Sequence, residues 1–468
     1  MNDIATSTPH ADLAAAIRRL ARASVLVVGD IMLDRYVYGT VSRISPEAPV
    51  PVLREERELA MPGGAGNVVR NLTALGAAVA FISVVGDDQA GSDLTALIGG
   101  QPNLTPWLLV QGGRCTTMKT RFVAHGQQLL RTDREEIAPV QPDLAERMLR
   151  IIGDAVAATS VTVLSDYRKG VLSGDVPARI IAAARKAGRP VVISTYGAAD
   201  LGRFAGADVA VISVDALTEA TGLGAPDDAT LGEAARHLRD RHGWGTVVVN
   251  RGERGLTIVS EAGVSHLPCV ATEIFDISGT FDTVAAALAA GIAAGLAMPL
   301  VAEIANLSMG VVLGRPGVAV ARDVDLLAAL APQGRALRKV VTREVAVEQV
   351  GQWRQLGWRT GFTNGSFDPL LPEHRALLDQ ARAACDRLVV GVSTGDEADD
   401  SPVPLLAALA GLPTVDLVCL YREPGPEQTL KALQPELLVE PEQKPSPDIA
   451  ALVASWGGKV LVRQGDAT

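Results

Sequence analysis

The chain has 468 residues, of which 48% are hydrophobic and 21% are charged, and its formal net charge is −10. This length exceeds what one hydrophobic core serves, so it predicts two or three domains, and the composition excludes a disordered chain. The acidic balance argues against nucleic acid and against an anionic membrane surface as partners, whereas a small phosphorylated ligand needs only a local site.

The first elements predicted along the chain are a buried strand and a separate small sheet. Residues 24–30 form an apolar run that ends in Gly-Asp, which is typical of a buried strand. Residues 37–61 and 115–133 contain short β-prone pieces without helical periodicity. Because they lie inside an α/β chain, these two regions predict a small sheet that stands off the main body as a lid.

The middle of the chain alternates strands with Ala-rich amphipathic helices, which is typical of a doubly wound parallel sheet. The strands are predicted at residues 161–165, 191–194, 209–213 and 246–250. The uncharged run from Thr283 to Ala302 has about the length of a membrane span. Its Ala and Gly content and Pro299 instead predict a helix buried between the sheet and its neighbours.

A charged stretch at residues 335–349 precedes a second, smaller α/β unit. Its helix is predicted at residues 374–386, and its strands at residues 359–363, 388–392, 415–421, 437–439 and 460–462. We therefore predict two domains, residues 1–335 and 336–468.

The four cysteines stand far apart and form no Cys-x-x-Cys pair; they are Cys115, Cys269, Cys385 and Cys419. This spacing argues against a disulfide framework and against a zinc site. Because the first residues also lack a basic-then-apolar signal pattern, the sequence predicts a protein of the reducing cytoplasm, with no bound metal of its own.

The turn before the uncharged run combines anion-binding and proton-transfer features. Residues 276–283 read Asp-Ile-Ser-Gly-Thr-Phe-Asp-Thr and lead into the helix. Backbone N–H groups at a helix N-terminus hold an anion, Gly279 lets the backbone approach it, and Asp282 takes a proton from an alcohol. This pattern suits phosphoryl transfer, although Phe281 stands where such a loop favours a residue without a side chain.

Three N-terminal segments carry a resemblance to a known family. Gly29–Tyr36, Ser42–Val52 and Pro62–Asn67 resemble the bifunctional heptose-7-phosphate kinase / heptose-1-phosphate adenylyltransferase, which serves ADP-heptose synthesis for lipopolysaccharide. The similarity covers nearly the whole chain in the same order, and Ser42–Val52 is specific to that family. It implies a ribokinase-like (PfkB) kinase domain with a small β lid, followed by a Rossmann-like α/β domain of the cytidylyltransferase type.

The resemblance implies a sugar-phosphate site in the first domain. Family positions that line the sugar pocket match Asp34, Gly63, Gly64 and Asn67, and the lid strands offer Arg121 and Gln128. Charged acceptors, an amide and a close backbone are what a polyol requires. The alternative is that Asp34 and Asn67 only cap turns.

The nucleotide site of the first domain departs from the family pattern. The family's Gly-Ala-Gly-Asp reads Gly279-Thr280-Phe281-Asp282 here, which keeps the base Asp282 and part of the anion hole at Gly279. The family's Asp-Pro-Lys-Gly reads Ser-Thr-Tyr-Gly at residues 194–197. The Asn and Glu that organise magnesium become Asp215 and a Glu219 that comes one place late. The turn with Arg251 and Gly252 is kept, although scaffold explains it equally well.

The second domain keeps one nucleotidyltransferase motif and loses others. The Thr-Asn-Gly-x-Phe-Asp motif is present, and it provides Asn364, Gly365 and Asp368 as nucleotide-binding candidates. The family's His-x-Gly-His becomes Leu-Pro-Glu-His at residues 371–374, so His374 alone remains as a catalytic candidate, with a structural role as its alternative. Residues 394–400 replace a Lys-Gly loop with an acidic one.

The departures fall on anion-binding loops in both domains, while the scaffold and sugar motifs are kept. We therefore predict a sugar-phosphate-binding pseudoenzyme with two impaired nucleotide sites. The alternative is an active heptose-7-phosphate 1-kinase that uses ATP and Mg²⁺, with Asp282 as the base and with weak or no adenylyl transfer. A third, structural possibility is a homo-oligomer, or a mixed oligomer with an active paralogue, paired through the lid.

Overall fold

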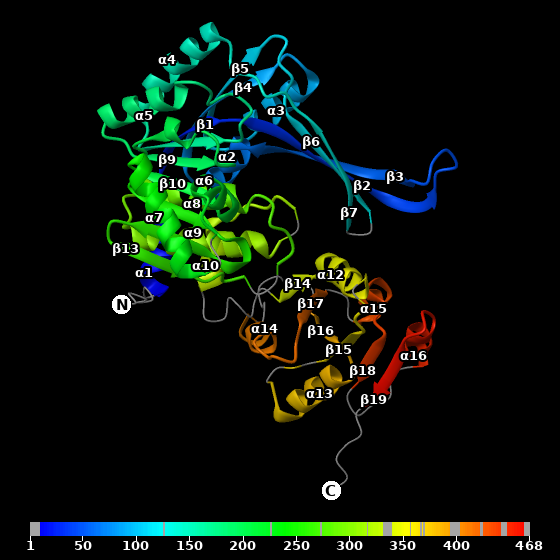
Figure 1. The fold of residues 1–468 in the computed structure, drawn as a ribbon. Coiled ribbons are helices and arrows are strands. Elements are labelled where there is room, and N and C mark those ends of the chain that lie inside the picture. The colour runs from blue at the N-terminus through cyan, green and yellow to red at the C-terminus, as the bar shows by residue number, and fades with distance from the viewer. Residues whose placement is uncertain are drawn as a thin grey trace. The chain divides into compact units, whose positions relative to one another are not determined.

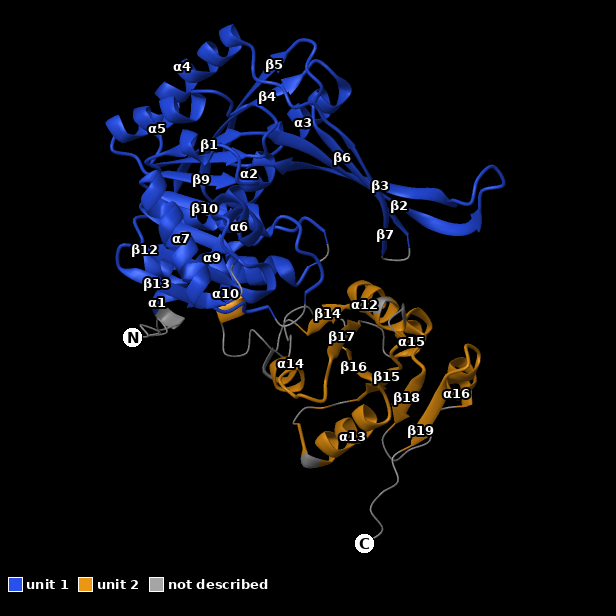
Figure 2. Ribbon diagram, viewed as in Figure 1, with its two compact units in different colours: residues 1–327 blue, residues 328–468 orange. Residues whose placement is uncertain are grey.

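The computed structural model describes residues 10–124, 127–224, 227–271, 274–315, 317–330, 339–355, 357–365, 367, 370–393, 403–421, 425–440 and 447–462. The chain divides into two compact units, Met1–Leu327 and Ala328–Thr468 (Figure 2). This division falls a few residues before the boundary predicted between residues 335 and 336.

Unit 1 is built on a large, mostly parallel sheet, which has nine strands within the described residues. Their order is β13 (Gly263–Leu267), β12 (Leu256–Ser260), β11 (Thr246–Asn250), β10 (Val209–Ser213), β9 (Val191–Thr195), β8 (Val161–Asp166), β1 (Ser24–Gly29), β4 (Ala78–Gly86) and β5 (Leu104–Gln111). Strands β12 and β13 are antiparallel to the rest. The strands predicted in the middle of the chain are thus confirmed as β8 to β11.

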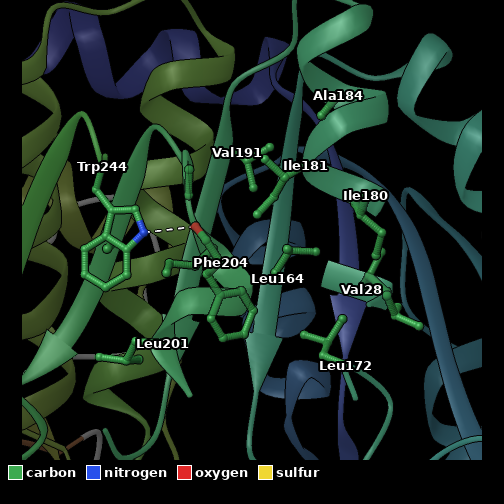
Figure 3. Close-up of a cluster of buried hydrophobic side chains, with 14 of the residues drawn as sticks. Val28, Leu164, Leu172, Ile180, Ile181, Ala184, Val191, Leu201, Phe204 and Trp244 are labelled. Atoms are coloured by element: carbon green, nitrogen blue, oxygen red, sulfur yellow. Dashed lines mark hydrogen bonds between the residues drawn. The ribbon is translucent and has the colours of Figure 1, made fainter. Parts of the chain in front are cut away.

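Helices cover both faces of this sheet, and strands β8, β9 and β11 are therefore buried along their whole length. One face carries α4 (Pro142–Ala158), α5 (Val176–Lys186), α6 (Val214–Thr221) and α7 (Asp228–His242). Figure 3 shows the core on this face, where the indole N–H of Trp244 donates to the carbonyl of Phe204 at 2.9 Å.

The other face carries the helices that hold the candidate site. Helix α8 (Thr280–Ala293) packs on β1, β8 and β9, and α2 (Ala65–Ala74) and α9 (Met298–Leu313) pack on α8. Unit 1 also contains α1 (His10–Arg19), α3 (Gln89–Gly99) and the short 3-10 turns Leu20–Arg22, Leu201–Phe204 and Gly252–Arg254. Helix α10 (Asp323–Leu330) contains the division between the two units.

The uncharged run from Thr283 to Ala302 forms parts of two helices, so the prediction of one helix there is wrong. Helix α8 ends where Gly295 adopts a left-handed conformation (φ +67°), with the N–H groups of Gly295 and Leu296 donating to Ile292 and Gly291. Pro299 then lies in the first turn of α9, where no N–H is needed. Among the described residues, no helix is long and apolar enough to cross a membrane.

A second sheet forms the predicted lid. Its order is β3 (Pro51–Gly64), β2 (Ile31–Ile44), β6 (Met118–Ala124) and β7 (Gln127–Arg134). Figure 1 shows these strands extending from the body of unit 1, with the β2–β3 hairpin reaching farthest. The inner ends of β2 and β3 are buried and their outer ends are exposed, so the same strands belong to both the body and the lid.

Unit 2 is a smaller doubly wound α/β unit. Its parallel sheet has the order β14 (Val340–Thr342), β17 (Leu417–Tyr421), β16 (Arg387–Ser393), β15 (Thr360–Asn364), β18 (Leu437–Glu440) and β19 (Lys459–Val462). One face is covered by α13 (Pro372–Ala383) and α14 (Val403–Ala410), and the other by α12 (Arg343–Gln355), α15 (Glu427–Leu433) and α16 (Pro447–Ala454). The strand order reverses at β15, which is where such sheets bind ligands.

Candidate functional site

The candidate site of unit 1 lies where β1, β8 and β9 end and α8 begins. Gly279 precedes α8 in a left-handed conformation (φ +77°), and a Cβ on it would lie 2.8 Å from the Asn67 amide nitrogen. The backbone N–H groups of Phe281 and Asp282 have no hydrogen-bond acceptor among the described residues. The turn therefore keeps free donors at a helix N-terminus, as its sequence predicts.

Two neighbours hold the carboxylate of Asp282, which is 3% exposed. The Asn67 amide donates to Oδ2 at 2.9 Å, and the Tyr167 hydroxyl donates to Oδ1 at 2.6 Å. Burial raises the pKa of Asp282 to about 7, because the two hydrogen bonds and Arg70 only partly offset the loss of water and the nearby Asp34 charge. An acid poised near neutral pH suits proton transfer.

Polar side chains of α2 fasten the start of α8. Asn71 donates to the carbonyl of Asn67 at 2.9 Å and accepts from the Thr283 hydroxyl at 3.1 Å. Arg70 donates to the Asn67 side-chain oxygen at 3.2 Å and to the carbonyl of Val318 at 3.3 Å. These bonds orient the Asn67 amide so that its nitrogen faces Asp282.

The predicted sugar-binding residues Asp34, Gly63 and Gly64 lie beside this group. A Cβ on Gly63 would collide with the Asp34 carboxylate, and one on Gly64 would lie 2.5 Å from the carbonyl of Asp30. Asp34 is 5% exposed and receives the Arg121 guanidinium from β6 at 2.6 Å. The structure thus brings together Asp34, Gly63, Gly64, Asn67, Arg121, Gly279 and Asp282.

A buried carboxylate that the sequence analysis did not single out shapes the adjoining loop. Asp30 accepts from the backbone N–H groups of Tyr167, Lys169 and Val171 at 2.9 to 3.0 Å. Burial, together with the Asp166 charge, raises the pKa of Asp30 to about 6 against these hydrogen bonds. This loop sets the place of Tyr167, whose hydroxyl reaches Asp282.

Phe281 and Tyr196, which the sequence analysis interprets as departures from the family's anion loops, contact one another. The ring of Phe281 is 5% exposed and lies 4.7 Å from the ring of Tyr196 between centroids. Tyr196 in turn stacks on Tyr167 at 4.4 Å. Phe281 therefore packs into an aromatic group and does not project freely over the first turn of α8.

Other predicted residues lie apart from this group. Gln128 is exposed on β7, at the level of Val123 and Tyr38, farther along the lid than Asp34. Asp215 and Glu219 are exposed on α6, which follows β10. Arg251 pairs with Asp228 and donates to the carbonyl of Arg254 at 2.8 Å, and Gly252 completes that turn.

In unit 2, Asn364 ends β15 at the reversal of strand order, and Gly365 follows it. The Asn364 Oδ1 is buried without a hydrogen-bond partner among the described residues. His374 accepts the N–H of Leu371 on Nδ1 at 3.2 Å, and its ring meets Phe367 edge-on at 5.5 Å. Asp368 and residues 394–400 lie outside the described residues.

In the part of the chain that the structure describes, no group of three or more His, Cys, Asp or Glu side chains gathers as a metal site would require.

Fold and sequence comparisons agree on the class of unit 1. Its fold is similar to that of Arabidopsis thaliana ribokinase (TM-score 0.54, 17% identity, 66% of this chain and 99% of that one). It is equally similar to phosphofructokinase-2 from Escherichia coli (TM-score 0.56, 17% identity, 66% and 99%). Residues 22–324 match the pfkB family of carbohydrate kinases, and unit 1 belongs to that family.

Whole-chain relatives narrow the identification. The protein named Bifunctional protein HldE from Acidiphilium cryptum is 54% identical over 97% of this chain and 95% of its own length. The protein of the same name from Paramagnetospirillum magneticum is 44% identical over 96% and 94%. The chain belongs to the HldE family, which confirms the resemblance predicted from its N-terminal segments.

Proposed function

We propose that unit 1 phosphorylates a sugar phosphate with ATP, and that the sugar phosphate is heptose 7-phosphate with its anomeric hydroxyl as the acceptor. The observation that carries this proposal is the position of Asp282, at the start of α8 and in contact with Asn67 and Tyr167. Asp34 and Gly63 adjoin it, so hydroxyl-binding groups lie beside a candidate base. Membership in the HldE family supports the choice of sugar.

Asp282 acts as the general base in this proposal. Its pKa of about 7 matches neutral pH, so the carboxylate accepts the proton of the anomeric hydroxyl as that oxygen attacks the γ-phosphorus. The bond from the γ-phosphorus to the β,γ-bridging oxygen breaks, ADP leaves, and the proton passes from Asp282 to solvent. Proximity of the two reactants supplies much of the acceleration.

The first turn of α8 fits the transferring phosphoryl group, because the N–H groups of Phe281 and Asp282 have no acceptor among the described residues. Mg²⁺ on the nucleotide supplies charge screening when it is bound.

The test is ADP release that depends on heptose 7-phosphate, with Asp282→Asn as the matched variant. We expect the variant to lose roughly 10²- to 10⁴-fold in kcat, since it lacks the base. If the natural protein released no more ADP than Asp282→Asn does, the kinase proposal would be wrong.

We infer that unit 2 does not transfer adenylyl groups. Leu371 stands where the family carries its first histidine, and the Nδ1 of His374 is engaged by the N–H of Leu371. Only one imidazole is thus left to stabilise the charge of the displacement. Pyrophosphate release from ATP and heptose 1-phosphate tests this inference, and release at ordinary enzyme rates would refute it.

A sugar-phosphate-binding pseudoenzyme is the second candidate, and the aromatic residues Tyr196 and Phe281 in the anion loops favour it. Calorimetry separates the two candidates. Binding of heptose 7-phosphate without binding of ATP·Mg²⁺ supports the pseudoenzyme, and binding of both supports the kinase.

We also propose a cytoplasmic homo-oligomer paired through the lid sheet. The lid exposes Ile44, Leu129 and Leu130, and β7 lies at the edge of the four-stranded sheet. The four cysteines are free, as in a reducing compartment. Sedimentation of the natural protein and of Leu129→Ser/Leu130→Ser tests the pairing, and equal masses at the monomer value for both would refute it.

A further inference from the structure

The aromatic group formed by Tyr167, Tyr196 and Phe281 extends from the candidate base to the two altered anion loops. Tyr167 follows β8, Tyr196 follows β9 and Phe281 lies in the first turn of α8. The Tyr196 ring stacks on the Tyr167 ring with a centroid distance of 4.4 Å. It meets the Phe281 ring at a tilt of 58° with a centroid distance of 4.7 Å. Residues that sequence comparison presents as two separate losses are therefore in direct contact.

Tyr167 is fixed at both ends. Its backbone N–H donates to the buried Asp30 carboxylate at 2.9 Å, and its hydroxyl donates to Asp282 Oδ1 at 2.6 Å. Its ring adjoins Gly64, where a Cβ would lie 3.5 Å from the Tyr167 Cδ2 atom. The second carboxylate oxygen of Asp282 belongs to Asn67. Tyr167 and Asn67 together thus determine which lone pairs of Asp282 remain for a ligand.

We propose that Tyr167 is a positioning residue that orients the Asp282 carboxylate toward the acceptor hydroxyl, and that the Phe281–Tyr196 pair holds the Tyr167 ring in place. The inference rests on the proposed kinase function, because it assigns Asp282 the role of base. In it, Phe281 supports the base from within the protein and does not obstruct the phosphate path.

The hydroxyl of Tyr167 also affects when Asp282 is ionised. The groups that face Asp282 are Tyr167 from the loop after β8, Asn67 and Arg70 from α2, Asp34 from β2 and Tyr196 after β9. The hydrogen bond from Tyr167 lowers the pKa of Asp282 against the effect of burial. Its removal is therefore expected to raise that pKa, so Asp282 stays protonated to higher pH.

The first experiment compares Tyr167→Phe with the natural protein over a range of pH. The variant keeps the ring and loses only the hydroxyl. We expect kcat to fall roughly 10- to 100-fold, KM for heptose 7-phosphate to change little, and the acid limb of kcat/KM to move to higher pH. Tyr36→Phe is the matched control, because the Tyr36 hydroxyl is buried without a hydrogen-bond partner among the described residues. An unchanged kcat and acid limb in Tyr167→Phe would overturn the inference.

The supporting pair is tested by Tyr196→Leu and Phe281→Leu, alone and together. If both residues act through Tyr167, each single change reduces kcat, and the fold-loss of the double variant is smaller than the product of the two single fold-losses. In the Tyr167→Phe background, neither change then reduces kcat further. Fully multiplicative losses that persist in the Tyr167→Phe background would refute this part. Thermal melts of each variant verify folding.

A readout without turnover separates this inference from the kinase proposal. The carbonyl stretch of protonated Asp282, assigned by its loss in Asp282→Asn, gives the titration midpoint of the ligand-free protein by infrared spectroscopy. A midpoint that rises in Tyr167→Phe supports the contact even if no ADP forms, in which case only the kinase proposal fails. Normal turnover with an unshifted midpoint would refute the positioning role alone.

Discussion

At the scale of single residues, the structure shows the contacts of side chains that the sequence analysis interprets only as departures from a family pattern. Phe281 and Tyr196 are interpreted from the sequence as departures in two separate loops, and in the structure the Phe281 ring packs on the Tyr196 ring. The two substitutions are neighbours in space although 85 residues separate them in the sequence. Phe281 and Tyr196, which look like two independent departures in the sequence, therefore form one contact in the structure.

Removing the Phe281 ring tests this view. In the sequence, Phe281 stands where the loop favours a residue without a side chain, and from this alone Phe281→Gly would be expected to raise kinase activity. The packing predicts the opposite, namely a lower rate and a loss of about 3–5 kcal/mol in stability from an emptied aromatic site. Phe275→Gly is the control, since Phe275 lies in the same loop and is 36% exposed. A higher kcat in Phe281→Gly would instead indicate that the Phe281 ring blocks the loop.

The raised pKa of Asp282 predicts a pH-dependent stability. Its pKa rises from 3.8 to about 7 on folding, so between these values the folded state binds the proton more tightly than the unfolded chain does. The stability that Asp282 contributes is therefore full at low pH and is lost as pH rises toward 7. Asp282→Asn removes this dependence, and we expect its free energy of unfolding to exceed that of the natural protein at pH 8 by a few kcal/mol but not at pH 4. Denaturant titrations at the two pH values measure it, and an equal difference at both would contradict it.

At the scale of elements, the site depends on how α2 meets the start of α8. Asn67 and Asn71 are separated by one turn of α2, and they contact Asp282 and Thr283 of α8. The contact spans 215 positions in the sequence, so it depends on the tertiary packing of α2 against α8. The alignment of these two helices is thus part of the site itself.

A side chain at Gly279 would disturb this junction. Gly279→Ala places a Cβ 2.8 Å from the Asn67 amide nitrogen on a backbone at φ +77°, so we expect a stability loss of about 1–3 kcal/mol. We also expect a fall in kcat greater than the fraction unfolded explains, because Asn67 must move away from Asp282. Gly317→Ala, at φ +69° with open space around it, controls for backbone strain alone. Equal effects of the two changes on kcat would show that the junction is unimportant.

The elements were largely predictable, and the site only in part. Residues 161–165 and 246–250 are short apolar runs, which is the pattern of a strand buried on both faces, and the structure buries both strands in this way. Asp282 was predicted from the small-residue turn before the uncharged run, and Asn67 was predicted through the resemblance. Tyr167 was not, because its role depends on a bond to Asp282 over 115 positions. The one local signal was its place at the end of a parallel strand, where ligand-binding residues gather. The break between α8 and α9 was missed because an uncharged run hides a helix end marked only by Gly295.

At the scale of the whole molecule, the two units have separate hydrophobic cores. The core of unit 1 includes Phe204 and Trp244, and the cores of unit 2 include Phe362 and Phe367. Within the residues that the structure describes, each of these three clusters contains residues of only one unit. A chain of this length is expected to divide its core in this way.

Separate cores predict two unfolding transitions. In scanning calorimetry, Phe204→Ala should lower the midpoint of one transition and Phe362→Ala that of the other, since each change removes a fully buried ring worth about 3–5 kcal/mol. The two variants control for each other. A single transition that both changes lower equally would show that the units unfold as one.

Strand β2 has one more consequence for how the lid can move. It runs without interruption from Ile31 to Ile44, and its first register shift against β3 lies between Tyr38 and Gly39, four residues beyond Asp34. A strand bends most readily at such an irregularity. The outer part of the lid can therefore swing about this irregularity while Asp34 keeps its register with β3. In the kinase proposed above, closure of the lid would thus leave the Asp34 carboxylate in place.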